Sequence, residues 1–462
     1  MATNSSTPDP AQKDQSQNTR HHIPRRTMML GSAAALGSAA AAAVAPVAAQ
    51  AADPGGSHQV LPARGQQRPG ATVVPGADRA AASRWSILRG QKVGVITNPT
   101  GILTDTMGSI VDAMVAARVD VAGVFGPEHG FRGTAQAGGS EDTYTDPRTG
   151  VTVYDAYGAQ ADKFATMFTD AGVQTVVFDI QDVGVRFYTY IWTMYQAMIA
   201  AVKLKLRFVV LDRPVPNGGN ADGPVMTPDY TSGVGQDALV QKHGMTAGEV
   251  ARYFNGEFMP AKAGGRLAKL DVVTVSGYRA DMLFADTGLP WVLPSPNMPT
   301  PDTALLYAGT GLFEATNLSE GRGTTRPFEI IGAPYVDYRW AQALNRRKLP
   351  GVWFREMYFT PTASKNANTV CGGVQVHILD PRKVQAIRTA VEMMVSLRDL
   401  YDDFGWRTGD TYSGYWADRL TGSARFRTQL DAGASAATIV AGWRSELAAF
   451  ERRRRPYLLY RR

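Results

Sequence analysis

The stretch Lys92-Val93-Gly94-Val95-Ile96-Thr97 decides the fold class, and it ends at the turn Asn98-Pro99-Thr100-Gly101. It is a short and almost continuous apolar run. Similar runs, rich in β-branched residues, recur at 119–125, 151–154, 175–179 and 207–211. Helical patterns fit between them, among others at 159–171 and 188–204. Strands that are buried on both faces have this composition, so we predict a parallel sheet covered by helices on both sides.

The pattern changes near residue 301. Helical stretches at 305–315, 383–400 and 436–452 alternate with strand-like pieces at 351–359 and 372–379. We therefore predict an α/β protein with a Rossmann-like parallel sheet domain over 73–300 and a smaller C-terminal α+β domain over 301–462. The cleft between them is the expected site. No G-x-G-x-x-G motif follows a strand, which argues against a dinucleotide cofactor.

The first residues have the pattern of an export signal. Arg25-Arg26 precede a Gly/Ala/Val run through Val47, and small residues fill 48–52. We predict a twin-arginine signal peptide over 1–51 and a disordered leader over 52–72. The protein would then be exported and be extracellular or associated with the cell wall. An uncleaved membrane anchor is the alternative, although stable membrane insertion after signal cleavage is not expected because alanine is only weakly apolar.

Composition limits the class of protein. Hydrophobic residues make up 44% of the 462 residues and charged residues 19%, as in ordinary globular proteins. The formal net charge is +7, but much of the basic excess lies at the chain ends. We attribute it to the export signal and to solvated helix surface, and we expect no nucleic-acid partner. The single cysteine, Cys371, excludes an intramolecular disulfide and is expected to be a packing residue.

Four segments carry functional-looking side chains. Three of them follow predicted strands, where the ligands of open α/β sheets bind. The fourth is a glycine-rich loop over 317–329. Their polar residues are, in chain order, Glu128 and His129; Asp179, Asp182, Arg186 and Tyr188; Asp212, Arg213 and Asn217; and Asn317, Glu320, Arg322 and Arg326.

This set suits the hydrolysis of a glycosidic bond. One protonated carboxyl must protonate the leaving oxygen, and a second, ionised group must act as base, nucleophile or electrostatic stabiliser. Glu128 and Glu320 lie in different predicted domains, so they could face each other across the cleft. Their separation would decide between retention and inversion. Arginines suit a carboxylate on the substrate, because guanidinium binds it in a bidentate manner.

Each of these residues also has a structural interpretation. Asp179 or Asp182 could cap the following helix. Asp212 and Arg213 could form a local ion pair, and Arg322 and Arg326 could pair with Glu320 and Glu329. His129 could orient its loop rather than transfer protons. These alternatives remain open at the level of the sequence.

Other chemistries have less support. The sequence contains no G-x-S-x-G, H-E-x-x-H or P-loop pattern. The three histidines of the predicted domains, His129, His243 and His377, have no ligand spacing, so we predict no metal and no cofactor.

Several of these blocks resemble the DUF1343/NamZ family. The resemblance rests on 93–101, on Gly-Pro-Glu-His-Gly-Phe-Arg-Gly at 126–133, on 178–190 and on 319–329, with further matches at 371–375 and 457–460. It implies a Rossmann-like domain joined to a smaller C-terminal domain. It also implies an exo-β-N-acetylmuramidase that releases non-reducing terminal N-acetylmuramic acid (MurNAc) from peptidoglycan-derived muropeptides or MurNAc-GlcNAc saccharides. One departure is Val215, where asparagine is expected.

The resemblance suggests roles for particular residues. Glu128 is the first choice of catalytic carboxylate and Glu320 the second, with His129, Asp179 and Asp182 in support. Arg186, Arg322 and Arg326 are candidates for the lactyl carboxylate of MurNAc, and Tyr188, Asn217 and Asn317 for other substrate contacts. The alternative function is a non-catalytic exported protein that binds cell-wall sugars. A wall amidase or esterase is disfavoured, because neither a nucleophile motif nor metal ligands are present.

Overall fold

Alternate residues of the central strands are buried on opposite faces of one sheet. A computed structural model describes residues 73–136, 138–139, 141–409 and 414–462, which belong to one compact unit. Its sheet has the order β3-β4-β2-β1-β5-β6-β9, and all neighbouring strands are parallel except β3 and β4. The strands are β1 (Val93–Thr97), β2 (Val121–Gly126), β3 (Tyr144–Thr145), β4 (Thr152–Asp155), β5 (Thr175–Asp179), β6 (Arg207–Leu211) and β9 (Leu270–Val273). The predicted parallel sheet is confirmed.

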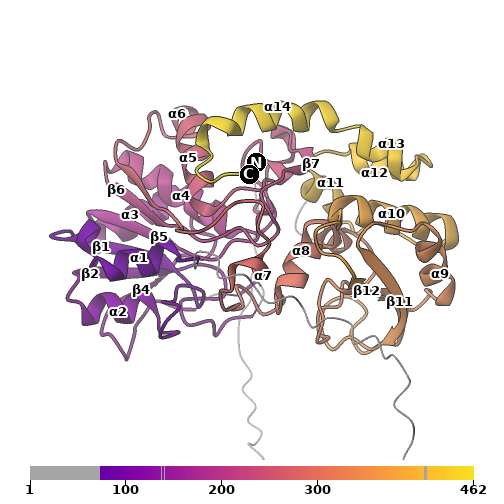
Figure 1. Ribbon diagram of the computed structural model, residues 1–462, viewed down its shortest axis with the longest axis horizontal. Coiled ribbons are helices and arrows are strands. Elements are labelled where there is room, and N and C mark those ends of the chain that lie inside the picture. Colours follow the sequence, from indigo (N-terminus) through magenta and orange to yellow (C-terminus); the bar gives the residue numbers. More distant parts are fainter. Residues whose placement is uncertain (1–72, 137, 140, 410–413) are drawn as a thin grey trace, which may run out of the picture. The chain divides into compact units, whose positions relative to one another are not determined.

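Helices cover both faces of this sheet (Figure 1). On one face Val95 and Val177 pack with residues of α1 (Gly76–Ala82) and α2 (Ile110–Ala116). On the other face Ile96 and Phe178 pack with α3 (Ala161–Asp170), α4 (Tyr190–Lys203) and α5 (Ala247–Glu257), which the short α6 (Met259–Lys262) follows. The continuous apolar runs of the strands follow from this burial on two sides.

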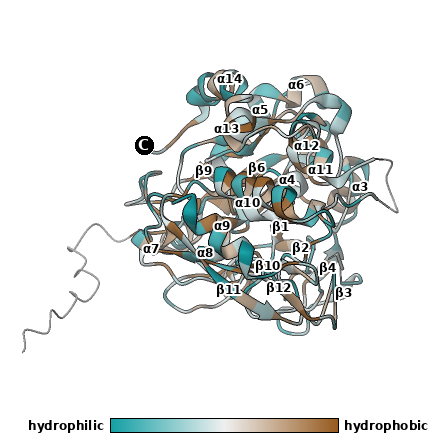
Figure 2. Ribbon diagram, turned by 90° about the vertical axis from the view of Figure 1, so that its right-hand side faces the viewer, coloured by the Kyte–Doolittle hydropathy of each residue, from teal (hydrophilic) through white to brown (hydrophobic). Residues whose placement is uncertain are grey.

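The C-terminal half is built around an antiparallel sheet of order β10-β12-β11, with strands Ile330–Ala333, Cys371–Ile378 and Val352–Phe359. Its helices are α8 (Pro301–Thr310), α9 (Tyr338–Arg346), α10 (Ala386–Leu400), α11 (Trp416–Thr421), α12 (Arg425–Asp431), α13 (Ala436–Ala441) and α14 (Arg444–Arg454). The smaller α+β part is thereby confirmed. Figure 2 shows hydrophobic and hydrophilic residues side by side along these helices, and one buried hydrophobic cluster runs from the large sheet through α8 and α10 to β12.

The C-terminal end of the chain differs from the sequence prediction. The helix expected over 436–452 is interrupted at Gly442-Trp443 and becomes α13 and α14. The last residues then pack against the Rossmann-like part, as the course of α14 in Figure 1 shows. There Tyr460 donates a hydrogen bond to Asp212 (2.6 Å) and Arg462 pairs with Glu249 (2.8 Å). Both carboxylates are fully buried and require such donors.

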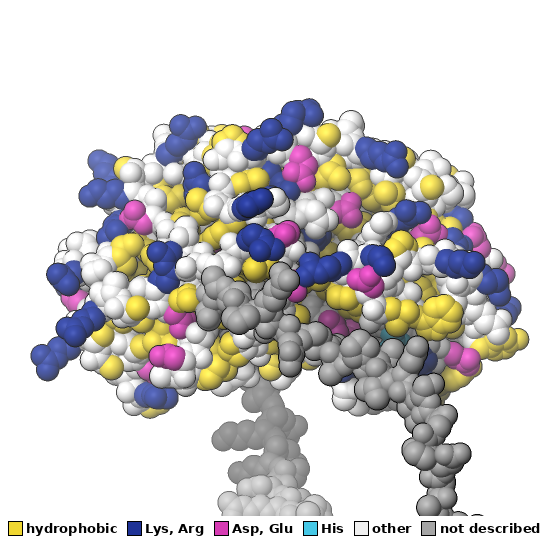
Figure 3. Space-filling view, in the orientation of Figure 1, with side chains coloured by type: hydrophobic (Ala, Val, Ile, Leu, Met, Phe, Trp, Pro, Cys, Tyr) yellow, Lys and Arg dark blue, Asp and Glu magenta, His cyan; other side chains and the backbone are white. Residues whose placement is uncertain are grey.

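The remaining elements are a hairpin and short connections. The hairpin consists of β7 (Asp222–Val225) and β8 (Val240–Lys242), and α7 (Phe284–Thr287) lies before α8. On the face drawn in Figure 3, Lys and Arg side chains are interspersed with Asp and Glu. Within the described part of the chain, no helix combines the length and hydropathy needed to cross a bilayer. The predicted signal peptide and leader lie outside the described residues.

Candidate active site

Glu128 stands on a tight loop directly after β2. The strand ends at Gly126, and Glu128 is only partly buried, whereas its neighbours Pro127 and His129 are buried. One carboxylate oxygen, Oε1, accepts a hydrogen bond from the backbone N–H of Gly138 (2.9 Å). The other, Oε2, accepts one from Thr189 Oγ1 (3.0 Å). The loop therefore fixes the Glu128 carboxylate, because each of its two oxygens accepts one hydrogen bond.

His129 fixes the shape of this loop. Its backbone has a φ of +74°, in the left-handed region that residues other than glycine seldom adopt. Its Nδ1 lies 3.1 Å from the carbonyl oxygen of Ala135 and 3.2 Å from that of Gln136. Carbonyls only accept, so Nδ1 carries the proton and Nε2 is left as an acceptor in the neutral ring. The sequence left open whether His129 orients its loop or transfers protons, and this geometry supports the orienting role.

Glu128 and His129 line a partly enclosed cavity of about 140 Å³. The other walls come from the segment 187–190 before α4, from α8 and from the loops around them. Three tyrosines form one side, with Tyr188 packed edge-on against Tyr190 (5.3 Å between ring centroids) and Tyr307 (5.8 Å). The complete lining is Glu128, His129, Phe187, Tyr188, Thr189, Tyr190, Val234, Ser295, Tyr307, Glu314 and Arg322.

A second carboxylate, Glu314, enters the same cavity from the C-terminal half. Arg322 holds it through Nη2 at 2.9 Å and, through Nε, holds Glu320 at 3.0 Å. Burial raises the pKa of Glu314, the Arg322 charge opposes this effect and the Glu320 charge adds to it. Glu314 thus keeps a proton to higher pH than an ordinary glutamate.

Glu320 lies behind Glu314 rather than in the cavity lining. It is 2% exposed, and its Oε2 pairs with Lys365 at 3.0 Å. Burial lowers the pKa of Lys365, while Glu320 and Glu314 raise it. Lys365 also donates to the carbonyls of Phe313 (2.6 Å) and Thr316 (2.7 Å). The described geometry therefore gives Glu320 a supporting position and leaves Glu314 as the second carboxylate that lines the cavity.

A second, more open cavity of about 250 Å³ adjoins the first. The two share His129 and Ser295, and the outer one has a wall of Pro99, Val292, Leu293, Pro294 and Pro296. This wall is apolar, and Leu293 is exposed. Taken together, the two cavities fall within the size range of small-molecule sites, about 300–1,000 Å³.

Asp179 lies outside both cavities and forms a buried ion pair with Arg213. It is fully buried at the end of β5, and Arg213 is 7% exposed. Arg213 Nη2 donates to Asp179 Oδ2 at 2.9 Å, and Nε makes a second bond to Oδ1. Burial raises the pKa of Asp179, and the Arg213 charge opposes this. The interpretation of Arg213 as the ion partner of Asp212 is therefore wrong.

Asp212 instead receives donors from two distant segments, the start of α5 and the C-terminal residues. Its Oδ2 accepts from Thr246 Oγ1 (2.7 Å) and Tyr460 Oη (2.6 Å), and its Oδ1 accepts from Gly248 N (2.8 Å). Nothing in the local sequence indicated these contacts.

We expect Asp179→Asn to lower the free energy of unfolding by about 3–5 kcal/mol, because it leaves the buried Arg213 charge unpaired. Urea unfolding of the purified protein measures this. Asp162→Asn, at an exposed ion pair with Lys203, is the matched control and should leave the midpoint unchanged. Unchanged stability combined with lost activity would instead favour the catalytic role predicted for Asp179.

Asp182 and Asn217 hold the turn at 182–184, and neither lines the cavity that contains Glu128. Asp182 Oδ2 accepts from Gly184 N (2.6 Å), and Asn217 Nδ2 donates to the carbonyl of Val183 (2.7 Å). His243 Nε2 lies 3.5 Å from Asp182. Helix α4 starts at Tyr190 after Thr189, which forms no side-chain cap, so the interpretation of Asp179 or Asp182 as helix caps is wrong.

Arg186 is fully buried and does not line either cavity. Its Nη1 donates to the carbonyls of Val234 (3.2 Å) and Arg419 (3.4 Å), and Nη2 to that of Leu420. Burial lowers its pKa to about 9. Arg186 thus joins the two halves of the chain, and this position gives a substrate no access to its guanidinium.

Asn317 and Arg326 lie on the surface, away from the cavity lining. Asn317 Nδ2 donates to the carbonyl of Asp403 (2.7 Å), and its Oδ1 accepts from Tyr335 (2.7 Å). Arg326 pairs with Glu329 at 3.3 Å, so the ion pairs considered for Arg322 and Arg326 are both present. Of the predicted substrate-binding residues, Tyr188 and Arg322 line the cavity.

Sequence reasoning missed Thr189, Tyr190, Ser295, Tyr307 and Glu314 as cavity residues. Glu314 carried one usable signal. It is a lone carboxylate inside the apolar run Leu312-Phe313-Glu314-Ala315, where a charge needs a partner or a function. Tyr307 lies in the predicted helical stretch 305–315, and burial alone does not distinguish a cavity residue from a core residue.

Comparison with known proteins assigns this arrangement to a family. Residues 93–302 match the domain described as "Exo-beta-N-acetylmuramidase NamZ, N-terminal", and residues 305–460 match its C-terminal counterpart. The chain belongs to the NamZ family. The family resemblance seen in the sequence is confirmed.

Known relatives of the family agree over most of the chain. The peptidoglycan β-N-acetylmuramidase NamZ of Bacillus subtilis (strain 168) is 42% identical over 391 residues, covering 84% of this chain and 91% of the relative. A crystal structure of a DUF1343 family protein from Bacteroides fragilis superposes with a TM-score of 0.75 at 33% identity, covering 84% of this chain and 99% of that one. A second such protein gives 0.67 at 29%, with the same coverage.

Proposed function

We propose that this NamZ family member is an exo-β-N-acetylmuramidase that hydrolyses the β-glycosidic bond of non-reducing terminal MurNAc in peptidoglycan fragments. The observation that carries the proposal is the pair of carboxylates, Glu128 and Glu314, which line one small cavity from the two halves of the chain. Glycoside hydrolysis needs two such groups in different protonation states. The peptidoglycan β-N-acetylmuramidase activity named for the Bacillus subtilis relative supports the substrate class.

The two cavities suit an exo-acting enzyme. The inner cavity, with its tyrosine wall and carboxylates, is small and partly enclosed, and it suits the reacting end of a terminal sugar. The outer cavity is more open and has an apolar proline-rich wall, on which the leaving saccharide can pack. A chain cleaved internally would need an open path on both sides of the carboxylates, so this arrangement supports cleavage at an end.

The environments of the carboxylates suggest different roles. Glu314 has a raised pKa and is suited to protonate the leaving oxygen. Glu128 accepts two hydrogen bonds with its carboxylate and is suited to act as base or nucleophile. Arg322 is the one of the three candidate arginines that lines the cavity, so we assign the lactyl carboxylate to it.

Export is part of the same proposal. A peptidoglycan substrate lies outside the cytoplasm, and the Arg25-Arg26 pair, the apolar run and the small residues at 48–52 support a twin-arginine signal and an extracellular or wall-associated location. Replacing both arginines with lysines should retain the protein in the cell, which fractionation and blotting would detect.

The function is tested with two defined disaccharides. The purified protein should release MurNAc from MurNAc-GlcNAc and release nothing from GlcNAc-MurNAc, as followed by mass spectrometry of the products. Release from both would contradict exo-action on MurNAc. Binding of MurNAc-GlcNAc without any release would support the alternative, a non-catalytic sugar-binding protein.

A further inference from the structure

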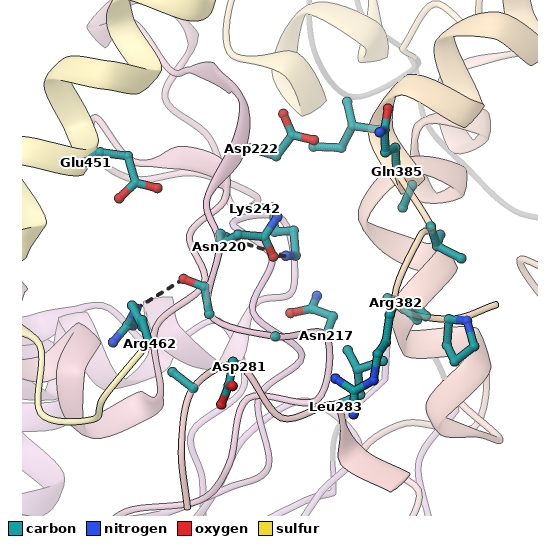
Figure 4. Close-up of a pocket in the computed structure, with 18 of the residues that line it drawn as sticks. Asn217, Asn220, Asp222, Lys242, Asp281, Leu283, Arg382, Gln385, Glu451 and Arg462 are labelled. Carbon is teal, nitrogen blue, oxygen red and sulfur yellow. Dashed lines mark hydrogen bonds between the residues drawn. The ribbon is translucent and has the colours of Figure 1, made fainter. Parts of the chain in front are cut away.

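A charged cavity without a role so far lies away from the two carboxylates. It has a volume of about 540 Å³ and lies between the β7–β8 hairpin, the loop 280–283, the start of α10 and the C-terminal residues (Figure 4). It shares no lining residue with the candidate active site. Helix α8 connects the two, because Leu305 lines this cavity and Tyr307 lines the other.

Most charged side chains in this cavity have an ion partner. Each of the pairs has its closest N–O distance between 2.8 and 3.0 Å. They are Arg454–Glu451, Arg462–Glu249, Arg382–Asp286 and Asp281–Arg279. The charges of these lining residues are therefore balanced by their partners.

Lys242 is an exception. It is 6% exposed, and its Nζ donates to the backbone carbonyl (2.9 Å) and the side-chain Oδ1 (2.6 Å) of Asn220. Among the described residues no carboxylate lies within 4.0 Å of it. An ammonium group has three protons, so one remains for a further acceptor. Burial lowers the pKa of Lys242 to about 7, while the charge of Asp222 opposes this effect.

Asp222 is the second exception, and it is the cross-strand partner of Lys242 in the hairpin. Its Oδ1 accepts from Gly223 N (2.7 Å), and within the described part of the chain no cation lies within 4.0 Å of its carboxylate. Burial raises its pKa, and the Gly223 N–H, the Lys242 charge and a hydrogen bond from Trp443 oppose this. Lys242 and Asp222 thus line the same cavity without forming a direct ion pair.

An unused acceptor lies in the same wall. Asn217 is 2% exposed and donates through Nδ2 to Val183, but its Oδ1 has no hydrogen-bond partner among the described residues. A buried polar atom without a partner is costly. Leu283, Leu305 and Ile387 provide apolar surface beside these groups.

We propose that this cavity is a second ligand site, which binds an amino acid or short peptide through its free ammonium and carboxylate groups. Lys242 receives the carboxylate of the ligand, Asp222 and Asn217 Oδ1 receive its ammonium, and the apolar wall holds its side chain. A simple anion would leave Asp222 unpaired, and a simple cation would leave Lys242 unpaired. A zwitterion satisfies both charges, and the cavity volume is within the range of small-molecule sites.

Isothermal titration calorimetry of the full chain with three probes tests this inference. The probes are alanyl-alanine, its N-acetylated form without an ammonium, and its C-terminal amide without a carboxylate. We expect the free dipeptide to bind at least tenfold more tightly than either capped form. Equal binding of all three probes, or no heat from the free dipeptide at millimolar concentration, would overturn the proposal without any variant.

Two variants assign the charges. The Lys242→Met protein should bind the free dipeptide no more tightly than it binds the C-terminal amide. The Asp222→Asn protein should bind the free dipeptide no more tightly than it binds the N-acetylated form. Lys203→Met, at an exposed lysine of α4, is the matched control and should bind like the unaltered chain. Glu128→Gln should also retain dipeptide binding; if it does not, the probe occupies the catalytic cavity and the proposal is wrong.

Discussion

Glu128→Gln is expected to lower kcat for MurNAc release by about 10²–10⁴-fold, the usual contribution of a positioned acid or base. Glutamine has the same shape as glutamate. It can accept the Gly138 N–H with its oxygen and offer its amide to Thr189 Oγ1, so the loop should keep its form. The loss would then reflect missing chemistry and not a displaced loop.

Release rates from MurNAc-GlcNAc under saturating substrate measure this effect, and binding of the same disaccharide should persist. Glu356→Gln, at an exposed glutamate of β11, is the matched control and should leave kcat unchanged. A Glu128→Gln protein with full turnover would remove Glu128 from the mechanism.

Glu314→Gln should also lower kcat by about 10²-fold or more on MurNAc-GlcNAc, if Glu314 is the acid. Glu320→Gln should change kcat by less than about tenfold but reduce stability, because Arg322 and Lys365 lose a partner that is almost fully buried. Comparing the two variants by turnover and by urea unfolding separates the carboxylate that lines the cavity from the one behind it. A large loss of kcat in Glu320→Gln and a small one in Glu314→Gln would instead favour Glu320 as the second catalytic carboxylate, as the sequence predicted.

The pH dependence provides an independent readout of Glu314. Its pKa is raised, and an acid catalyst acts only when protonated, so activity is present below that pKa and falls as the pH rises through it. Glu314→Gln should remove this descending limb. It should also lose less activity on 4-nitrophenyl β-MurNAc, because nitrophenolate leaves without protonation. If the Glu314→Gln protein still loses activity as the pH rises, a group other than Glu314 causes that loss.

Much of the fold could be predicted because its signal is local. Near-continuous apolar runs at 93–97, 175–179 and 207–211 require strands buried on two faces, and the intervening periodicity requires helices. The break at Gly442-Trp443 escaped prediction. It depends on the packing of Trp443 and the return of α14 to the sheet, which are contacts between distant residues.

The candidate site was predicted only in part. Glu128 and His129 could be found because Gly-Pro-Glu-His-Gly places two polar side chains in a tight turn at a strand end. Arg186 looked like a ligand for a carboxylate but is fully buried among backbone carbonyls. Spacing along the chain cannot tell which way an arginine side chain of this length turns.

The sequence by itself determined the parallel sheet, the family and the loop that holds Glu128, since these depend on neighbouring residues and on contiguous motifs. Only the tertiary structure decided that Glu314 and not Glu320 enters the cavity, that Asp179 pairs with Arg213, and that Lys242 and Asp222 line a second cavity. The physical reason is that burial and ion pairing depend on which distant residues meet, and this is set by the packing of the whole chain.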